Sequence, residues 1–166
     1  MESEEIIDTG PADSKKKQGG SGPFANLQNL RSFTTFSRLP EKDLLDLTFY
    51  RNMGVGYVPR RHWCFLGEIV DIVPTIRLNL FVKDASGENL FIAFHTDGRG
   101  REVKLSKVRV DKTVAVLYAN RHAFMFSPTG IRHEEPSSLT VCKQTLLDSE
   151  IASYANTVPT DYPHVP

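Results

Sequence analysis

Apolar and polar residues alternate between positions 63 and 95 in a way that predicts three consecutive antiparallel strands, over residues 63–73, 77–83 and 89–95. In the second and third strands, every other residue is large and apolar, which is typical of one buried sheet face: Leu78, Leu80, Val82, Leu90, Ile92 and Phe94. The opposite face carries Asn79, Phe81, Lys83, Phe91, Ala93 and His95. Two large aromatic residues therefore stand on the side that a core would leave free.

Turn residues separate these strands and set off later ones. Pro74-Thr75 divides the first two strands, and the stretch 84–87 ends in a glycine that suits a hairpin turn. Gly67 interrupts the long first strand, where the missing side chain permits a bulge or a sharp coil. Further strands are predicted over residues 113–118, 131–134 and 139–143, and a short helix or turn over 101–108.

The segments before the first strand differ in character. Residues 1–23 are polar and rich in glycine, serine and proline, which predicts a disordered tail. Residues 24–39 repeat an apolar residue every three positions, which indicates an arm that docks on the domain or binds a partner. Pro40 opens a predicted short helix whose apolar face would contain Leu44, Leu45, Leu47 and Phe49.

The order of elements favours a mainly β fold, a five-stranded OB-like barrel with short flanking helices and a disordered N-terminal tail. An SH3-like barrel and a small β-sandwich stay open as alternatives. The expected domain organisation is a tail over 1–23, an arm and helix over 24–56, the barrel over 57–147 and a C-terminal helix and tail over 148–166.

Charge is distributed unevenly along the chain, although the net charge is zero. The chain of 166 residues has a formal net charge of zero, but residues 51–145 carry fourteen Lys/Arg against nine Asp/Glu, a balance of +5 between acidic ends. Cys64 and Cys142 are expected to be reduced, buried thiols, although a disulfide between barrel strands is geometrically possible. No apolar run is long enough for a membrane span, and the expected compartment is the cytosol or the nucleus.

One stretch resembles a known domain. The segments FHTDGRG, VAVLYANRHAF, GIRHEE and SLTV, with FLGEIVDI ahead of them, are similar in order and spacing to a domain of uncharacterised fungal proteins. In those proteins it often precedes a MYND-type zinc finger. The resemblance implies a β-rich interaction module without an established activity. It does not extend to zinc, because a MYND finger needs many closely spaced Cys and His ligands and this chain has two cysteines.

The candidate binding residues combine positive charge with flat side chains, which is what a single nucleic-acid strand requires. They are Arg77, Phe81, Phe91, His95, Arg99, Arg101, Lys104, Arg121 and Arg132. The glycine-rich loop 97–101 could cradle a phosphate, although it lacks the pattern of a phosphate-binding loop. No catalytic motif and no histidine spacing for a metal site is present, so no catalytic residue, metal or cofactor is assigned.

These patterns predict a non-enzymatic interaction module. Recognition of a protein partner is the leading expectation, because the arm and the sheet edges suit strand addition. Binding of single-stranded nucleic acid on the side of Phe81 and Phe91 is the alternative. An enzyme with a histidine and arginine pocket is a third. The choice depends on whether residues 24–39 cover Phe81 and Phe91 or leave them exposed.

Overall fold

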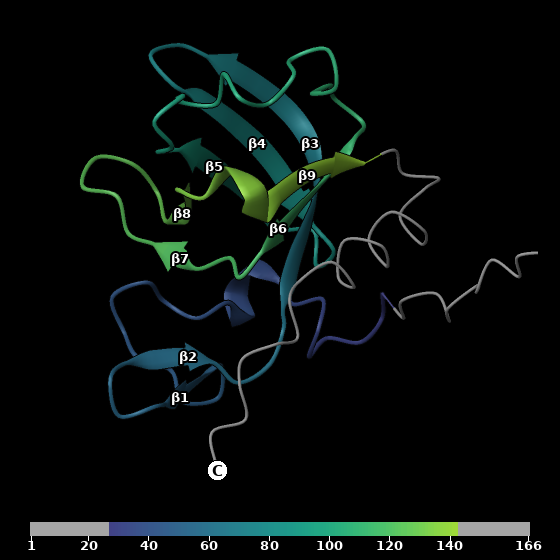
Figure 1. The fold of residues 1–166 in the computed structure, drawn as a ribbon. Coiled ribbons are helices and arrows are strands. Elements are labelled where there is room, and N and C mark those ends of the chain that lie inside the picture. The colour runs from purple at the N-terminus through teal and green to yellow at the C-terminus, as the bar shows by residue number, and fades with distance from the viewer. Residues whose placement is uncertain (1–26, 143–166) are drawn as a thin grey trace, which may run out of the picture.

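The computed structural model describes residues 27–142, so the predicted tail over 1–23 and the predicted C-terminal helix lie outside the described residues. Strands dominate, and the described residues form no α-helix (Figure 1). The elements are η1 (Phe36–Arg38), β1 (Tyr50–Asn52), β2 (Tyr57–Pro59), β3 (Cys64–Pro74), β4 (Leu78–Asp84), β5 (Asn89–Phe94), β6 (Thr113–Leu117), β7 (Arg121–His122), β8 (Gly130–His133), η2 (Pro136–Ser138) and β9 (Leu139–Cys142).

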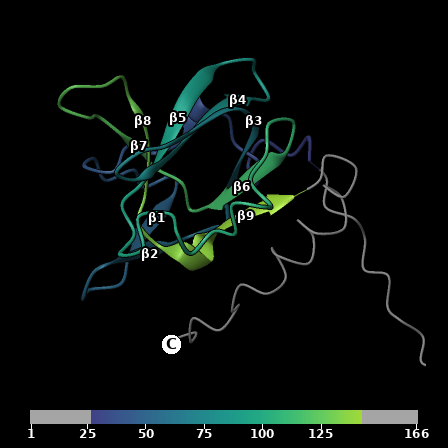
Figure 2. The ribbon, with the colours of Figure 1, turned by 90° about the horizontal axis from the view of Figure 1, so that it is seen from above.

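The main sheet has seven strands in the order β7-β8-β5-β4-β3-β6-β9, and β1 pairs with β2 in a separate hairpin. All neighbours in the main sheet are antiparallel except β5 and β8. Viewed from above, the strands follow one another around a curve (Figure 2). β9 is the last strand at one end of the sheet, and β8 is the second strand from the other end. Five residues, 134–138, join β8 to β9 in the sequence, but the two strands do not pair with each other.

The predicted strands are present, within one or two residues at each end. The prediction of a mainly β fold is confirmed. The sheet has seven strands and is not closed by hydrogen bonds, so the five-stranded barrel stays a prediction. The two helical segments among residues 27–142 are single 3-10 turns. The stretch 101–108 consists of turns, and it leads through Val108, which is buried, back to β6.

The predicted helix after Pro40 is wrong. The backbone there bonds to β7 instead: Lys42 donates its amide to the carbonyl of Arg121, and Arg121 donates to Pro40. Tyr50 then begins a strand that turns back through Gly54, whose φ of +81° suits glycine. The leucines expected on the buried helix face, Leu44, Leu45 and Leu47, are between 51% and 64% exposed.

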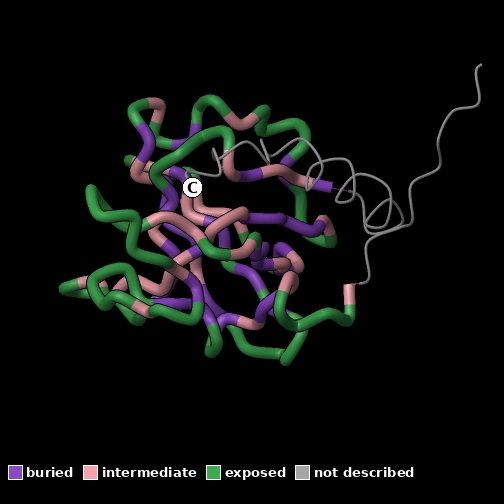
Figure 3. Tube along the Cα trace, turned by 60° about the horizontal axis from the view of Figure 1, so that its bottom comes forward, coloured by how far each residue is buried: buried purple, intermediate pink, exposed green. Residues whose placement is uncertain are grey.

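The core lies on the inner face of the curved sheet. Phe65, Ile69, Leu80, Ile92 and Phe94 have no exposed surface, and buried segments gather in the interior of the molecule (Figure 3). The alternation predicted for the second strand is confirmed by the burial of β4. In β5, Leu90, Ile92 and Phe94 are buried as predicted, but Ala93, which was expected on the outward face, is buried as well. Both cysteines are buried thiols, and burial raises the pKa of Cys64 to about 12.

Trp63 fills the end of the core nearest the β1–β2 hairpin. Its indole is 1% exposed and lies edge-on to the rings of Phe49, Tyr50 and Tyr118, at centroid distances of 4.9 to 5.4 Å. The indole N–H donates to the carbonyl of Ala119 at 2.8 Å. This residue therefore ties the hairpin to the main sheet through packing and a buried hydrogen bond.

The long first strand bulges, but not at Gly67. The register between β3 and β4 shifts between Ile69 and Asp71, so Val70 is the extra residue. Gly67 instead permits close approach, because a Cβ there would lie 3.0 Å from Val82 and from the Phe65 ring. Its part in the fold is to let the strongly coiled strand pack tightly on its inner side.

The arm docks on the domain, as one of the two interpretations of its apolar repeat predicts. Thr34 donates its amide to the carbonyl of Cys64, and Cys64 donates to Ser32, so the arm lies against the start of β3. Phe36 is buried and donates its amide to a carboxylate oxygen of Asp84 at 2.9 Å. The described part of the arm thus contacts the start of β3 and the end of β4.

Asp84 fastens this arm, and replacing it by asparagine should weaken the fold by about 1–3 kcal/mol. The buried carboxylate accepts the amides of Phe36, Ser86 and Glu88 and the Ser86 hydroxyl. Burial alone would raise the pKa of Asp84, but these hydrogen bonds outweigh it and lower the pKa.

Because the pKa of Asp84 is lower in the folded state than in the unfolded state, its ionised carboxylate stabilises the fold. This stabilisation is fully present above the unfolded-state pKa of about 3.9, and it is lost as the pH falls through the folded-state pKa. Urea unfolding of wild type and Asp84→Asn at pH 7 and in acid should therefore give a difference that shrinks towards low pH. An equal difference at every pH would contradict an ionised Asp84 as its source.

Candidate functional site

The outward face of β3, β4 and β5 carries a row of three residues that lie directly opposite one another. Asp71 pairs with Phe81, and Phe81 pairs with Phe91, so all three side chains project from the same side of the sheet. Phe81 is 41% exposed, and its ring centroid lies 6.3 Å from that of Phe91. The described arm contacts β3 at Cys64 and β4 at Asp84, not at this row, so Phe81 is exposed and Phe91 is partly exposed.

The connection from β7 to β8 extends this aromatic surface. Phe124 packs on Phe91 with ring centroids 4.9 Å apart, and it also contacts His95 at 6.0 Å and His122 at 4.7 Å. Gly130, at the start of β8, allows the close approach, because a Cβ there would lie 2.5 Å from the carbonyl oxygen of Phe91. Phe81, Phe91, Phe124, His95 and His122 are together called the aromatic face.

A hollow opens beside Phe81 and Phe91. The bulge residues Val70 and Asp71 bound it on one side and residues 128–129 on the other, with Asn89 and Leu90 completing its lining. Its surface is mainly apolar, with polar atoms offered by Asp71, Asn89 and Thr129. None of its lining residues is basic.

Positive charge lies at the opposite side of the aromatic face. Arg132 pairs with Ala93, two residues along β5 from Phe91, and so projects from the same side of the sheet. Burial lowers the pKa of His95, and the neighbouring cations Arg77 and Arg132 and the ring of His122 lower it further against the opposing effect of Glu134. His95 is therefore neutral at pH 7, and the charge there comes from the arginines.

The glycine-rich loop 97–101 brings two further arginines without forming a phosphate cradle. The amides of Arg99 and Arg101 donate to Thr96 and Gly98 within the loop, and that of Gly100 donates to the Thr96 hydroxyl. The carbonyl of Arg99 accepts the amide of Leu78, which places the loop beside the start of β4 and Arg77. The guanidinium groups, not the amides, are what this loop offers a ligand.

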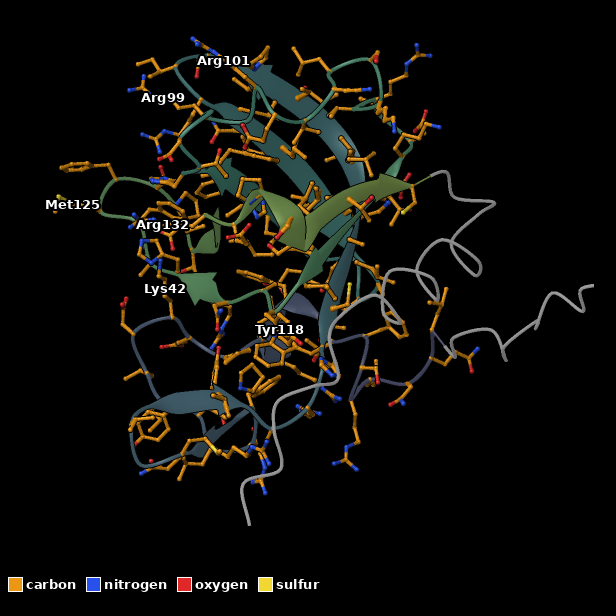
Figure 4. The ribbon with its side chains drawn as sticks, in the orientation of Figure 1. Lys42, Arg99, Arg101, Tyr118, Met125 and Arg132 are labelled. Atoms are coloured by element: carbon orange, nitrogen blue, oxygen red, sulfur yellow. The ribbon has the colours of Figure 1, made fainter. Side chains whose placement is uncertain are left out.

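Figure 4 shows Arg132 and Lys42 on the side of the molecule that carries β7 and β8, with Arg99 and Arg101 at the top of the view. Arg99 and Arg101 have no ion pair among residues 27–142, whereas Arg132 contacts Glu134, which also binds Lys42. Arg99 and Arg101 can therefore bind an anionic ligand without first breaking such an ion pair, whereas Glu134 partly neutralises Arg132 and Lys42.

Two predicted site residues do not join the others. Arg121 binds Glu41 at 2.7 Å and pairs its backbone with the segment before β1, so it fastens that segment. Lys104 is exposed in the turns that lead to β6, outside the strands that carry the aromatic face. Phe124 and His122 were absent from the predicted set, because only the short β7 pairing carries them to β5.

Two further features of the described part of the chain concern metal ions and membranes. Between residues 27 and 142, no three metal-binding side chains converge. No helix in that range is long and apolar enough to cross a membrane.

Comparisons with known proteins assign no family to the chain. No family model matches the chain, and no curated protein is significantly similar to it. Among solved structures, it is similar to Pot1pC of Schizosaccharomyces pombe, crystallised with the single-stranded DNA CGGTTACGGT. The match covers 60% of this chain and 91% of that one, at 8% identity and a TM-score of 0.39. A likeness at this level establishes neither a shared family nor a shared activity.

Proposed function

We propose that the main sheet is an OB-type barrel in which β8 and β9 together form the fifth strand. β3 pairs with β4 and β6, β5 pairs with β8, and β6 pairs with β9. Because only residues 134–138 separate β8 from β9, the chain itself joins the two ends of the curved sheet. The OB-type barrel is five-stranded and partly open, which agrees with a closing strand split in two.

We propose that this barrel binds single-stranded nucleic acid, without catalysis, on its aromatic face. The observation that carries the proposal is the aromatic pair on β4 and β5, formed by the exposed Phe81 and the partly buried Phe91. Phe124 extends this pair, and Arg77 and Arg132 border it. Flat side chains accept the faces of unpaired bases, and guanidinium groups bind the phosphates between them. OB-type barrels bind oligonucleotides with the face of their second and third strands, which β4 and β5 represent here.

The proposed ligand is a single strand because stacking on an open ring requires a free base face. In a duplex, neighbouring base pairs cover those faces, and only groove edges and phosphates remain. The aromatic face lies on the sheet surface, and residues 27–142 form no projecting helix that could enter a groove. A single strand laid across β4 and β5 satisfies both the rings and the arginines.

Salt titration tests the proposal. Fluorescence anisotropy with a labelled mixed-sequence 12-mer should give saturable binding at about 25 mM salt, with two to four phosphate contacts and a slope of log K against log salt of about −1.5 to −3. The matching duplex should bind more weakly. Absence of binding to the single strand at the lowest salt would contradict the proposed function, since phosphate contacts are strongest there.

A protein contact is a second candidate, favoured by a different surface. Leu44, Leu45, Leu47 and Val55 are all more than half exposed on the segment that contains the β1–β2 hairpin. Replacing Leu44 and Leu47 by aspartate should then abolish capture of the partner and leave oligonucleotide binding intact. The resemblance to the domain that precedes MYND fingers stays a prediction.

A further inference from the structure

The bulge in β3 brings a carboxylate to the aromatic row. Ile69 pairs with Val82, and regular pairing would then place Val70 opposite Phe81. The extra residue shifts the register, so Asp71 occupies that position instead. Val70 and Asp71 are both exposed on the outward side, as a bulge allows. The row therefore begins with an acid and continues with two aromatic rings.

The carboxylate has capacity to bind a ligand. Its Oδ1 atom accepts the amide of Ile72 at 2.8 Å, and no described residue donates to Oδ2. Asp71 lines the hollow together with Phe81 and Phe91, and no lysine or arginine lines it. An anionic phosphate is therefore disfavoured in the hollow, while a flat group with N–H donors at its edge suits it.

We propose that this hollow is a base pocket in which Asp71 selects bases that carry an exocyclic amino group. The inference rests on the proposed function. A base stacked on Phe81 would direct its edge towards Asp71, and a carboxylate accepts hydrogen bonds from the N4 amino group of cytosine. Thymine and uracil present a carbonyl oxygen at the same place, which the carboxylate repels.

The charges around the hollow orient the strand. The next outward row, two residues along each strand, is Val73, Asn79, Ala93 and Arg132, and Arg77 lies beyond it near His95. Phosphates therefore follow the arginine side, and bases point across the rings towards the bulge. The face has a base side and a phosphate side, separated by the Phe81–Phe91 pair.

Paired homopolymers test the pocket. Anisotropy with labelled dC12 and dT12, which differ mainly at the base edge and stack weakly on themselves, should show about 5- to 30-fold tighter binding of dC12 to the wild type. Asp71→Ala should reduce this ratio to about one and leave dT12 binding equal or stronger. Asp71→Asn, whose amide can donate to the thymine carbonyl, should shift the ratio further towards dT12.

A second carboxylate on the same strand supplies the control. Glu68 faces Lys83 at 3.8 Å outside the hollow, so Glu68→Ala removes one negative charge without touching the pocket and should keep the dC12 preference. Equal binding of dC12 and dT12 by the wild type, or a preference that survives Asp71→Ala, overturns the base pocket and leaves nucleic-acid binding standing. Failure of both oligonucleotides at low salt removes the proposed function as well.

Discussion

Truncating Trp63 to alanine should lower the free energy of unfolding by about 3–5 kcal/mol, a large part of the stability of a domain this size. The indole is 1% exposed and is enclosed by three aromatic rings, so its removal leaves a cavity that the neighbours cannot fill. It also leaves the Ala119 carbonyl without its donor. The β1–β2 hairpin should loosen first, because Trp63 packs on both Phe49 and Tyr50.

Urea unfolding followed by far-ultraviolet circular dichroism measures this effect. Trp63 is the single tryptophan of the chain, so its fluorescence reports wild-type unfolding but is lost in the variant. Phe126→Ala, which truncates a ring that is 92% exposed, should change stability by no more than about 0.5 kcal/mol. If the two variants lost equal stability, Trp63 would not hold the hairpin on the sheet.

Removing both rings of the Phe81–Phe91 pair should weaken single-strand binding by about 30-fold or more, because each stacked base contributes about 1–3 kcal/mol. Phe81→Ala/Phe91→Ala leaves the arginines in place, so the slope of log K against log salt should stay unchanged while the affinity falls. Arg77→Ala/Arg132→Ala should do the reverse and reduce the slope by about 1.4. Anisotropy across a salt series separates the two effects.

Tyr57→Ala is the matched control for this experiment. Tyr57 is an aromatic residue 51% exposed on β2, away from the aromatic face, so its loss should leave oligonucleotide affinity unchanged. A Phe81→Ala/Phe91→Ala variant that unfolds like wild type and still binds with wild-type affinity would assign the ligand to another surface.

The sequence predicts what depends on local periodicity. Alternation placed Leu80 and Ile92 inside and Phe81 and Phe91 outside. Leu80 and Ile92 are buried, Phe81 is exposed, and Phe91, its cross-strand partner, is partly buried. The choice between a covered and an exposed Phe81 could not be made, because the arm's apolar repeat does not say which strands it contacts. The structure places those contacts at Cys64 and Asp84.

The features that could not be predicted from the sequence depend on pairings between distant segments. The leucines after Pro40 have a helical spacing, yet the backbone of this segment forms hydrogen bonds with the backbone of Arg121. The bulge at Val70 depends on the partner strand, so Asp71 did not stand out as a neighbour of Phe81. Phe124 reaches Phe91 only through the two-residue β7. In each case a long-range hydrogen bond overrides the local pattern.

The split strand β8–β9 has a consequence for how the chain folds. Residues 130–142 supply the partners of both β5 and β6, whose outer edges stay unpaired until this last segment arrives. During synthesis those edges emerge before their partners, and closing such distant contacts slows folding. Pairing of β8 and β9 therefore completes the sheet. It also covers the edges of β5 and β6, which could otherwise pair with strands of other chains.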